Sequence, residues 1–163
     1  MSAARRLRVT VAAGGALALS SLARADAPTD QYGIFDLGTV VIQDAQTGLA
    51  WQRYASATAV NLDAATSRCA GLSFPGFVGG WRVPSYKELL TLVDEVPHVE
   101  YENAGLVTKS IDGNAFPGAL VDELYWSSST YLGFSQSAYV VNFETGEGEN
   151  QSMNSTGYVR CVR

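Results

Sequence analysis

The sequence predicts an α+β fold with an antiparallel sheet, two helices and a long irregular loop region. β-branched and aromatic runs lie towards both ends of the chain, and two helical patterns lie between them. Residues 94–123 are rich in Gly and Pro and contain only short apolar runs. Strands grouped apart from helices are typical of α+β domains. A long loop in a compact domain is usually either functional or disordered.

The first 25 residues have the three parts of a signal peptide. Arginines precede an apolar stretch over residues 9–22, and small residues allow cleavage after Ala25. The apolar stretch is too short to cross a bilayer comfortably, and no other stretch is long and apolar enough. We therefore expect an exported protein, periplasmic or extracellular, with no membrane insertion. We expect a flexible lead-in over residues 26–37 and a single domain over residues 38–163.

Charge and length restrict the partners of the mature chain. Four of the eleven basic residues lie in the predicted leader, whereas all sixteen acidic residues follow it. The mature chain of 138 residues therefore has a formal net charge of −9. Such a charge argues against nucleic acid and anionic membranes as partners. The length suits one domain with a hydrophobic core.

The two cysteines, Cys69 and Cys161, are predicted to form one disulfide. A single, widely separated pair in an exported protein most simply forms a structural bond. A catalytic or metal-binding pair of thiols is the alternative. The chain has no C-x-x-C motif, and its only histidine is His98, so we favour the structural bond.

Five short runs are predicted to be strands. Residues 39–42 and 49–51 flank a turn sequence in which Asp44 can close an Asx turn and Gly48 can adopt a positive φ. They therefore form a predicted hairpin. The other three runs close the chain, at residues 125–130, 138–143 and 157–162.

Two helices are predicted from their capping residues. Asn61 is a suitable N-cap for a helix over residues 62–70, and Gly71 is a suitable stop. In the stretch GWRVPSYKELLTL, Ser85 and Glu88 have the spacing of a capping box. Apolar residues follow that box at helical spacing and predict the second helix.

Aromatic and hydroxyl residues in the predicted strands have two interpretations. Trp51, Trp81 and Trp126 have large apolar faces that can stack on sugar rings. Because each lies in a predicted strand, we expect all three in the core. The serines at 127–129 are not surrounded by a G-x-S-x-G motif, so we expect no catalytic residue among them and no enzyme activity.

Six short segments occur in an order that resembles a known family. They are DAQTGLAWQ (44–52), a helix with a cysteine, GWRVPSYKELLTL (80–92), YWSSST (125–130), AYVVNF (138–143) and YVRCVR (158–163). Together they resemble the bacterial DUF1566 family, also called the Lcl C-terminal domain after a collagen-like surface adhesin. The resemblance covers roughly residues 38–163.

The resemblance implies a C-type-lectin-like fold, related to the formylglycine-generating sulfatase-modifying enzymes. In that fold a disulfide joins the first helix to the last strand, and Cys69 and Cys161 occupy those places. The resemblance also implies a binding role, which makes this chain an exported, non-catalytic module. Its expected partner is a glycan, or else another envelope or extracellular ligand such as a protein.

Calcium is the one cofactor for which the sequence offers ligands. Glu144, Glu147 and Glu149 have hard carboxylate oxygens of the kind that calcium binds. However, the Glu-Pro-Asn, Gln-Pro-Asp and Trp-Asn-Asp tripeptides of calcium-dependent lectins are absent. We favour the alternative that this segment is an acidic, solvated hairpin with no metal.

The predicted ligand site lies where the 94–123 loop meets the 144–154 segment. Loops carry recognition when a rigid sheet positions them, and these two stretches do not have the composition of a core. Their spare oxygen and amide ligands are Glu102, Asn103, Asp112, Asn114, Asp122, Glu147, Glu149 and Asn150.

Two other function classes remain open at this stage. One is a structural or protein–protein interaction module of an envelope assembly. The other is an oxidase like the formylglycine-generating enzymes, which needs two reactive cysteines close together near the surface. A buried disulfide would exclude that oxidase. The sequence leaves open the identity of the ligand and the oligomeric state.

Overall fold

The computed structural model describes residues 27–28, 30–33, 40–102, 105–119 and 123–163, without the side chains of Glu100 and Glu102. The predicted signal peptide and half of the predicted lead-in lie outside the described residues. No helix in the described ranges has both the length and the apolar character to span a bilayer. The elements are β1 (Tyr32–Gly33), β2 (Val41–Asp44), β3 (Ala50–Gln52), α1 (Leu62–Ala70), β4 (Ser73–Phe74), β5 (Phe77–Val78), α2 (Tyr86–Leu90), β6 (His98–Glu102), β7 (Gly105–Lys109), β8 (Leu124–Thr130), β9 (Ser137–Asn142) and β10 (Gly148–Ser152).

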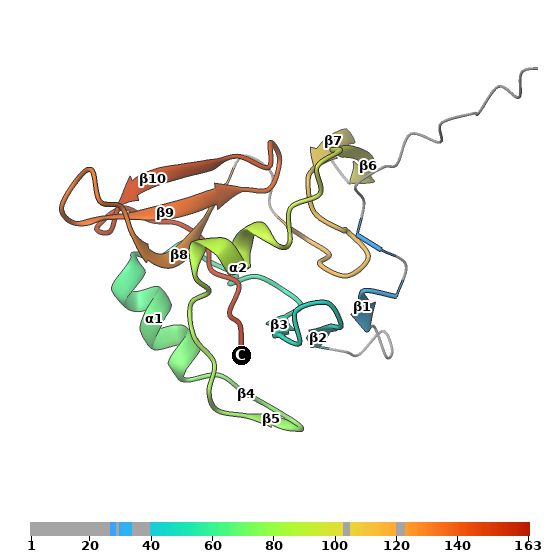
Figure 1. The fold of residues 1–163 in the computed structure, drawn as a ribbon, viewed down its shortest axis with the longest axis horizontal. Helices are drawn as coiled ribbons and strands as arrows, with labels where there is room; N and C mark the ends of the chain where they lie inside the picture. Colours follow the sequence, from blue (N-terminus) through green and yellow to red (C-terminus); the bar gives the residue numbers. More distant parts are fainter. Residues whose placement is uncertain (1–26, 29, 34–39, 103–104, 120–122) are drawn as a thin grey trace, which may run out of the picture.

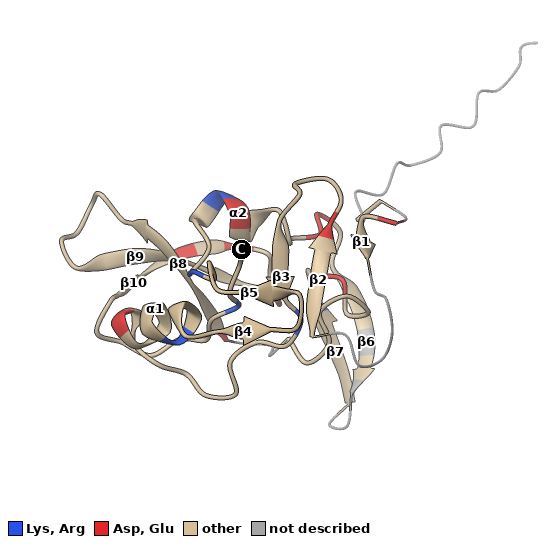
Figure 2. Ribbon diagram, turned by 90° about the horizontal axis from the view of Figure 1, so that it is seen from below, with Lys and Arg blue, Asp and Glu red and all other residues tan. Residues whose placement is uncertain are grey.

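Small antiparallel sheets and two short helices make up the fold, so the α+β prediction is confirmed. One sheet has the strand order β1-β2-β3 and another β10-β9-β8, while β4–β5 and β6–β7 are separate hairpins. The sheet β10-β9-β8 and helix α1 lie at one end of the long axis, and β1, β6 and β7 lie at the other (Figures 1 and 2).

The hairpin of β2 and β3 forms as predicted, with its strands shifted by up to two residues. The Asp44 carboxylate accepts hydrogen bonds from the main-chain amides of Gln46 and Thr47, at 2.9 and 3.3 Å. Gly48 has a φ of +73°, which a residue with a side chain rarely adopts. The Asx turn and the glycine therefore set the register of this hairpin.

Helix α1 has the predicted bounds and the predicted N-cap. The Asn61 side chain accepts a hydrogen bond from the amide of Ala64 at 2.9 Å. Leu62, Ala65 and Cys69 are buried on one face, as their spacing requires. Gly71 ends the helix, but in a right-handed conformation with φ −84°, not in the left-handed conformation that glycine caps commonly adopt.

Helix α2 begins at the predicted capping box and is shorter than its apolar pattern indicates. Ser85 Oγ accepts from the amide of Glu88, and the Glu88 carboxylate accepts from the amide of Ser85 at 2.7 Å. The same carboxylate forms two hydrogen bonds with the Arg82 guanidinium, at 2.6 and 2.8 Å. The helix ends at Leu90, and tight turns then bury Leu92.

The terminal run at 157–162 is not the regular strand that was predicted. Val162 instead forms isolated antiparallel bridges with both Trp51 and Arg82, and Gly157 forms one with Val60. This segment therefore lies between the β2–β3 hairpin and Arg82, which precedes α2. Its apolar residues complete both parts of the core, one around the disulfide and the other around Trp51.

The region at 94–123 is less irregular than predicted. Its first part forms the β6–β7 hairpin, with Val99 paired to Thr108 and Tyr101 to Leu106. The part that follows is irregular and is attached to the body by the buried side chains of Ile111 and Phe116.

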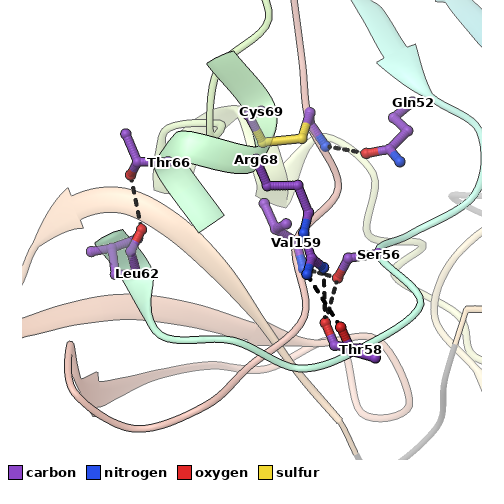
Figure 3. The surroundings of a disulfide bond; sticks show 9 residues. Gln52, Ser56, Thr58, Leu62, Thr66, Arg68, Cys69 and Val159 are labelled. Atoms are coloured by element: carbon purple, nitrogen blue, oxygen red, sulfur yellow. Dashed lines mark hydrogen bonds between the residues drawn. A yellow bond between two sulfur atoms is a disulfide. The ribbon is translucent and has the colours of Figure 1, made fainter. Parts of the chain in front are cut away.

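The disulfide between Cys69 and Cys161 is present. Their Cα atoms are 5.5 Å apart, both side chains are fully buried, and the bond joins α1 to the terminal segment. Figure 3 shows the bond next to Gln52, whose side-chain oxygen accepts from the amide of Cys161 at 3.2 Å. On the other side Ser56 Oγ accepts from the amide of Val159.

Removing the disulfide should strongly destabilise the domain. The bond closes a loop across 92 residues, so the chain-entropy model gives about 4–5 kcal/mol of stabilisation. Denaturant unfolding of the Cys69→Ala/Cys161→Ala variant should therefore have a much lower midpoint than the oxidised protein. The reduced wild-type protein is the control and should match the variant. Equal midpoints for the oxidised protein and the variant would contradict the prediction.

The ion pair between Arg82 and Glu88 should make stability depend on acidic pH. The hydrogen bonds from Arg82, followed by those from Ser85, lower the pKa of Glu88 from 4.5 to about 2. Because the folded pKa is depressed, the pair stabilises the fold above pH 4.5 and loses that effect as the pH falls towards 2.

Glu88→Gln isolates this effect because glutamine also completes a capping box. The difference in free energy of unfolding between wild type and variant should be constant above pH 5 and should shrink between pH 5 and 2. Glu147→Gln, at an exposed carboxylate, is the control. Parallel curves for wild type and Glu88→Gln down to pH 2 would refute the role of the pair.

Candidate functional site

Four aromatic rings form a continuous line along the β8–β9 end of the molecule, which we call the aromatic strip. Tyr86 is stacked on Tyr139, with ring centroids 4.5 Å apart and planes 19° apart. Tyr131 contacts Tyr139 edge to face at 5.2 Å and is stacked on Phe134 at 6.0 Å. The three tyrosines are half-buried, and Phe134 is 65% exposed.

Three separate elements position the strip. Tyr86 is the first residue of α2, next to the capping box, and its amide donates to Ser129 Oγ on β8 at 3.0 Å. Gly148 on β10 leaves room for the end of this ring. A Cβ atom on Gly148 would lie 1.8 Å from the Tyr86 hydroxyl oxygen. The stack between Tyr86 and Tyr139 therefore requires a glycine at this position.

Strand β10 adds a polar side chain to the strip. Asn150 lies opposite Tyr139 in the antiparallel ladder, and Glu149 lies opposite Val140. Because side chains alternate along a strand, Asn150 and Gly148 share the face of Tyr139, whereas Glu149 is on the other face. Asn150 is exposed, so its amide can donate and accept hydrogen bonds beside the rings.

The predicted site residues of the 94–119 region have structural roles or lie elsewhere. Asp112 Oδ1 accepts from the amides of Asn114 and Ala115 at 2.8 and 3.0 Å and so stabilises a turn. The main-chain oxygen of Asn114 accepts from Arg53 at 3.2 Å. Three predicted ligands are not described, namely the side chain of Glu102 and the whole of Asn103 and Asp122.

The described parts of the two predicted segments meet at Ser110. The amide of Ser110 donates to the main-chain oxygen of Phe143 at 2.7 Å, and Ser110 Oγ donates to that of Glu144 at 3.1 Å. Beyond this contact the segments diverge, because residues 110–119 turn towards the first hairpin while β10 follows β9 (Figure 1). Among the predicted ligands that the structure describes, Asn150 adjoins the aromatic strip, opposite Tyr139.

Glu144, Glu147 and Glu149 do not form a metal site in this structure. Across the described part of the chain, no three His, Cys, Asp or Glu side chains gather closely enough to hold a metal ion. Glu147 is exposed in the turn before β10, and Glu149 is exposed on the strand itself. The 144–151 segment is thus an acidic, exposed hairpin.

The model of the Lcl C-terminal domain family matches residues 40–163. The chain belongs to this family. No curated protein shows significant similarity to it. The matched range contains every element from β2 to the C-terminus, and hence all four rings of the aromatic strip.

The tryptophans of this Lcl C-terminal domain are core residues, as predicted. Trp51, Trp81 and Trp126 are all buried, and Trp81 donates from its indole nitrogen to the main-chain oxygen of Phe77 at 2.9 Å. They are therefore not available to a ligand. Tyr139 on β9 and Tyr86 on α2, which the sequence analysis did not select as site residues, are partly exposed instead.

The three serine hydroxyls of β8 are hydrogen-bonded to main-chain groups of neighbouring segments. Ser127 Oγ donates to the oxygen of Tyr139 at 2.7 Å, and Ser128 Oγ donates to that of Pro84 at 3.2 Å. In the Lcl C-terminal domain these serines therefore join β8 to its neighbours. Both acceptors are main-chain oxygens, so neither hydrogen bond pairs a serine with a base.

Gly148→Ala should separate Tyr86 from Tyr139 and leave the fold intact. The added Cβ meets the free end of a tyrosine, which can rotate away. Loss of the stack and gain of a better strand residue offset each other, so the free energy of unfolding should change by less than about 1 kcal/mol. The near-ultraviolet circular dichroism of the tyrosines should change clearly.

Gly71→Ala is the matched control, because its Cβ would have only ordinary contacts at 3.5 Å or more. It should leave the near-ultraviolet spectrum unchanged. A Gly148→Ala spectrum identical to that of the wild type would show that Tyr86 is not held against Tyr139.

Proposed function

We propose that this Lcl C-terminal domain is an exported, non-catalytic binding module whose ligand is carbohydrate, held along the aromatic strip. The observation that carries the proposal is the strip itself, with Asn150 beside Tyr139. Rings that stay partly exposed contribute less to core packing than buried rings do. Phe134 and Leu132, which are 65% and 97% exposed, extend this apolar surface.

The chemistry of the strip suits a sugar. The apolar face of a pyranose can pack on an aromatic ring, and the tyrosine hydroxyls and the Asn150 amide can bond its hydroxyl groups. The formal charge of −9 on the mature chain favours a neutral glycan over an anionic one. Recognition by rings and an amide needs no calcium, so we propose binding without a cofactor.

We further propose that the fold is C-type-lectin-like. The disulfide from the first helix to the terminal segment supports this, as do the small antiparallel sheets. The disulfide supports export as well, because such bonds persist in oxidising compartments such as the periplasm and the exterior. Residues 1–25, which resemble a signal peptide, also support export.

The oxidase alternative is the least favoured. Its chemistry needs two accessible thiols, whereas Cys69 and Cys161 are bonded to each other and fully buried. Thiol chemistry begins with an exposed thiolate. This arrangement supports a structural role for both cysteines.

A protein–protein interaction module of an envelope assembly is the second candidate. The β6–β7 hairpin presents Val99, Tyr101 and Leu106 to solvent, at 60%, 85% and 62% exposure. Their positions in the ladder put them on one face of the hairpin. An exposed apolar face of this kind is typical of an interaction surface.

A glycan array with and without a calcium chelator tests the main proposal. The wild-type protein should bind a neutral glycan equally in both conditions. Phe134→Ala and Asn150→Ala should each weaken binding of that glycan by roughly fivefold, which corresponds to about 1 kcal/mol. Both residues are exposed, so the variants should keep the wild-type melting temperature.

Tyr101→Ala is the matched control, since it removes an exposed aromatic ring from β6 at the other end of the molecule. It should bind the glycan as the wild type does. A protein that binds no glycan on the array, or that binds equally well in both strip variants, would refute the proposal. Binding that disappears with the chelator would refute recognition without calcium.

A further inference from the structure

Arg160 is a buried cation with one edge that contacts no protein acceptor. Its side chain is fully buried, and Nη1 donates to the main-chain oxygens of Gln52, at 2.9 Å, and Arg53. The other two nitrogens, Nε and Nη2, are buried and have no hydrogen-bond partner among the described residues. These two N–H groups point the same way along one edge of the guanidinium. They form the fork with which arginine binds an anion at two points.

The indole of Trp51 lies on the same side of the terminal segment. Val162 forms an antiparallel bridge with Trp51, and the amide of Gln52 donates to the main-chain oxygen of Cys161. Because side chains alternate along an extended chain, Arg160 and Val162 share the face of Trp51, opposite the face of Cys161. Trp51 is fully buried, and its Nε1 also has no hydrogen-bond partner in the described part of the chain.

The positive charge of Arg160 has no negative partner in the described ranges. Arg160 forms no salt bridge with a described carboxylate. Burial lowers the pKa of the guanidinium to about 10, and the phenols of Tyr125 and Tyr32 oppose that effect. The guanidinium is therefore charged at pH 7, whereas a phenol is ordinarily neutral at that pH.

The carboxylates in this part of the fold form other interactions. Burial, followed by Asp44, Asp94 and Asp112, raises the pKa of Tyr32. Each of these three carboxylates accepts a hydrogen bond from a main-chain amide. None of them is among the groups that shift the pKa of Arg160. Because a buried charge without compensation is strongly destabilising, Arg160 calls for a negative charge that these side chains do not supply.

We propose that the Nε and Nη2 edge of Arg160 binds one small monovalent anion, which is a structural part of the core. The fork supplies two donors, and the indole of Trp51 is a candidate for a third. A water molecule accepts similar hydrogen bonds but leaves the charge of Arg160 unbalanced. A doubly charged anion leaves an excess of negative charge. The site shares no residue with the aromatic strip, so this inference does not depend on carbohydrate binding.

The size of the ligand follows from burial. The two nitrogens of the fork and the indole nitrogen are shut off from solvent, so the anion must be small enough to be enclosed with them. A spherical halide such as chloride and a planar carboxylate such as formate both meet this condition. The same fork accepts either chemistry.

Unfolding by urea at fixed ionic strength tests the proposal. Urea is the denaturant because guanidinium chloride would itself supply the anion. The oxidised full chain is unfolded at pH 7 in sodium gluconate, whose anion is too large to be enclosed. Gluconate is then replaced stepwise by chloride or, in a second series, by formate.

At anion concentrations above the dissociation constant, each tenfold rise should lower the unfolding equilibrium constant by about tenfold, because unfolding releases one anion. The anion that acts at the lower concentration identifies the chemistry that the fork prefers. Identical unfolding midpoints in gluconate, chloride and formate would overturn the proposal.

Arg160→Met removes the charge and the fork. It should abolish the dependence on chloride and formate, whatever its effect on the midpoint itself. Arg163→Met is the matched control, because it removes an exposed arginine from the same segment. This control should keep the dependence of the wild type. A dependence that survives in Arg160→Met would show that the anion binds elsewhere.

Crystals of the wild-type protein locate the anion even if Arg160→Met fails to fold. Crystals grown in bromide should give an anomalous peak at hydrogen-bond distance from Nε and Nη2 of Arg160. Crystals grown in formate should show planar density at the same edge. Water alone at this edge in both crystals, or bromide only beside exposed arginines, would refute the assignment.

Discussion

The terminal segment is the part of the chain on which the other elements depend. Its main-chain oxygens accept hydrogen bonds from the first hairpin, the loop before α1, the residues before α2, and β8. Cys161 within it is bonded to α1. Because these elements are small, few of them would bury enough surface alone. The segment joins them by offering a partner on each side, and the two parts of the core meet along it.

Because the terminal segment lies at the centre of the fold, it buries a charged side chain, Arg160, and removes it from water. Its side chain is fully buried, and Nη1 donates to the main-chain oxygens of Gln52 and Arg53. The guanidinium carbon lies 4.7 Å from the ring centroid of Phe116, in a cation–π contact. Burial lowers the pKa of Arg160 to about 10, and Tyr125 opposes that effect. The group therefore stays charged at neutral pH and is stabilised by oxygens and rings.

Local chemistry explains what could be predicted from the sequence. The Asx turn at Asp44, the cap at Asn61 and the box at Ser85 each depend on a few adjacent residues, and all three formed.

The other features depend on pairing between distant residues. Strand β10 is exposed along nearly its whole length, so its sequence has no apolar alternation and predicts an acidic, solvated hairpin. The aromatic strip combines Tyr86 of α2 with Tyr139 of β9 and with two rings of the connection between β8 and β9, so it depends on how α2 packs against that sheet. The terminal segment had the composition of a strand, but it pairs briefly with several partners.

The position of that segment also determines when the domain can become complete. Its partners begin near residue 50, so most of its contacts join residues about a hundred positions apart. Such contacts close large loops and form late, which makes folding slow. A chain that emerges N-terminus first presents these residues after all of their partners. Until they arrive, Trp51 and the cysteine of α1 lack their partners, and the unfinished domain exposes apolar surface to whatever receives it. If the chain is exported, as we propose, its translocation and the final folding step are linked.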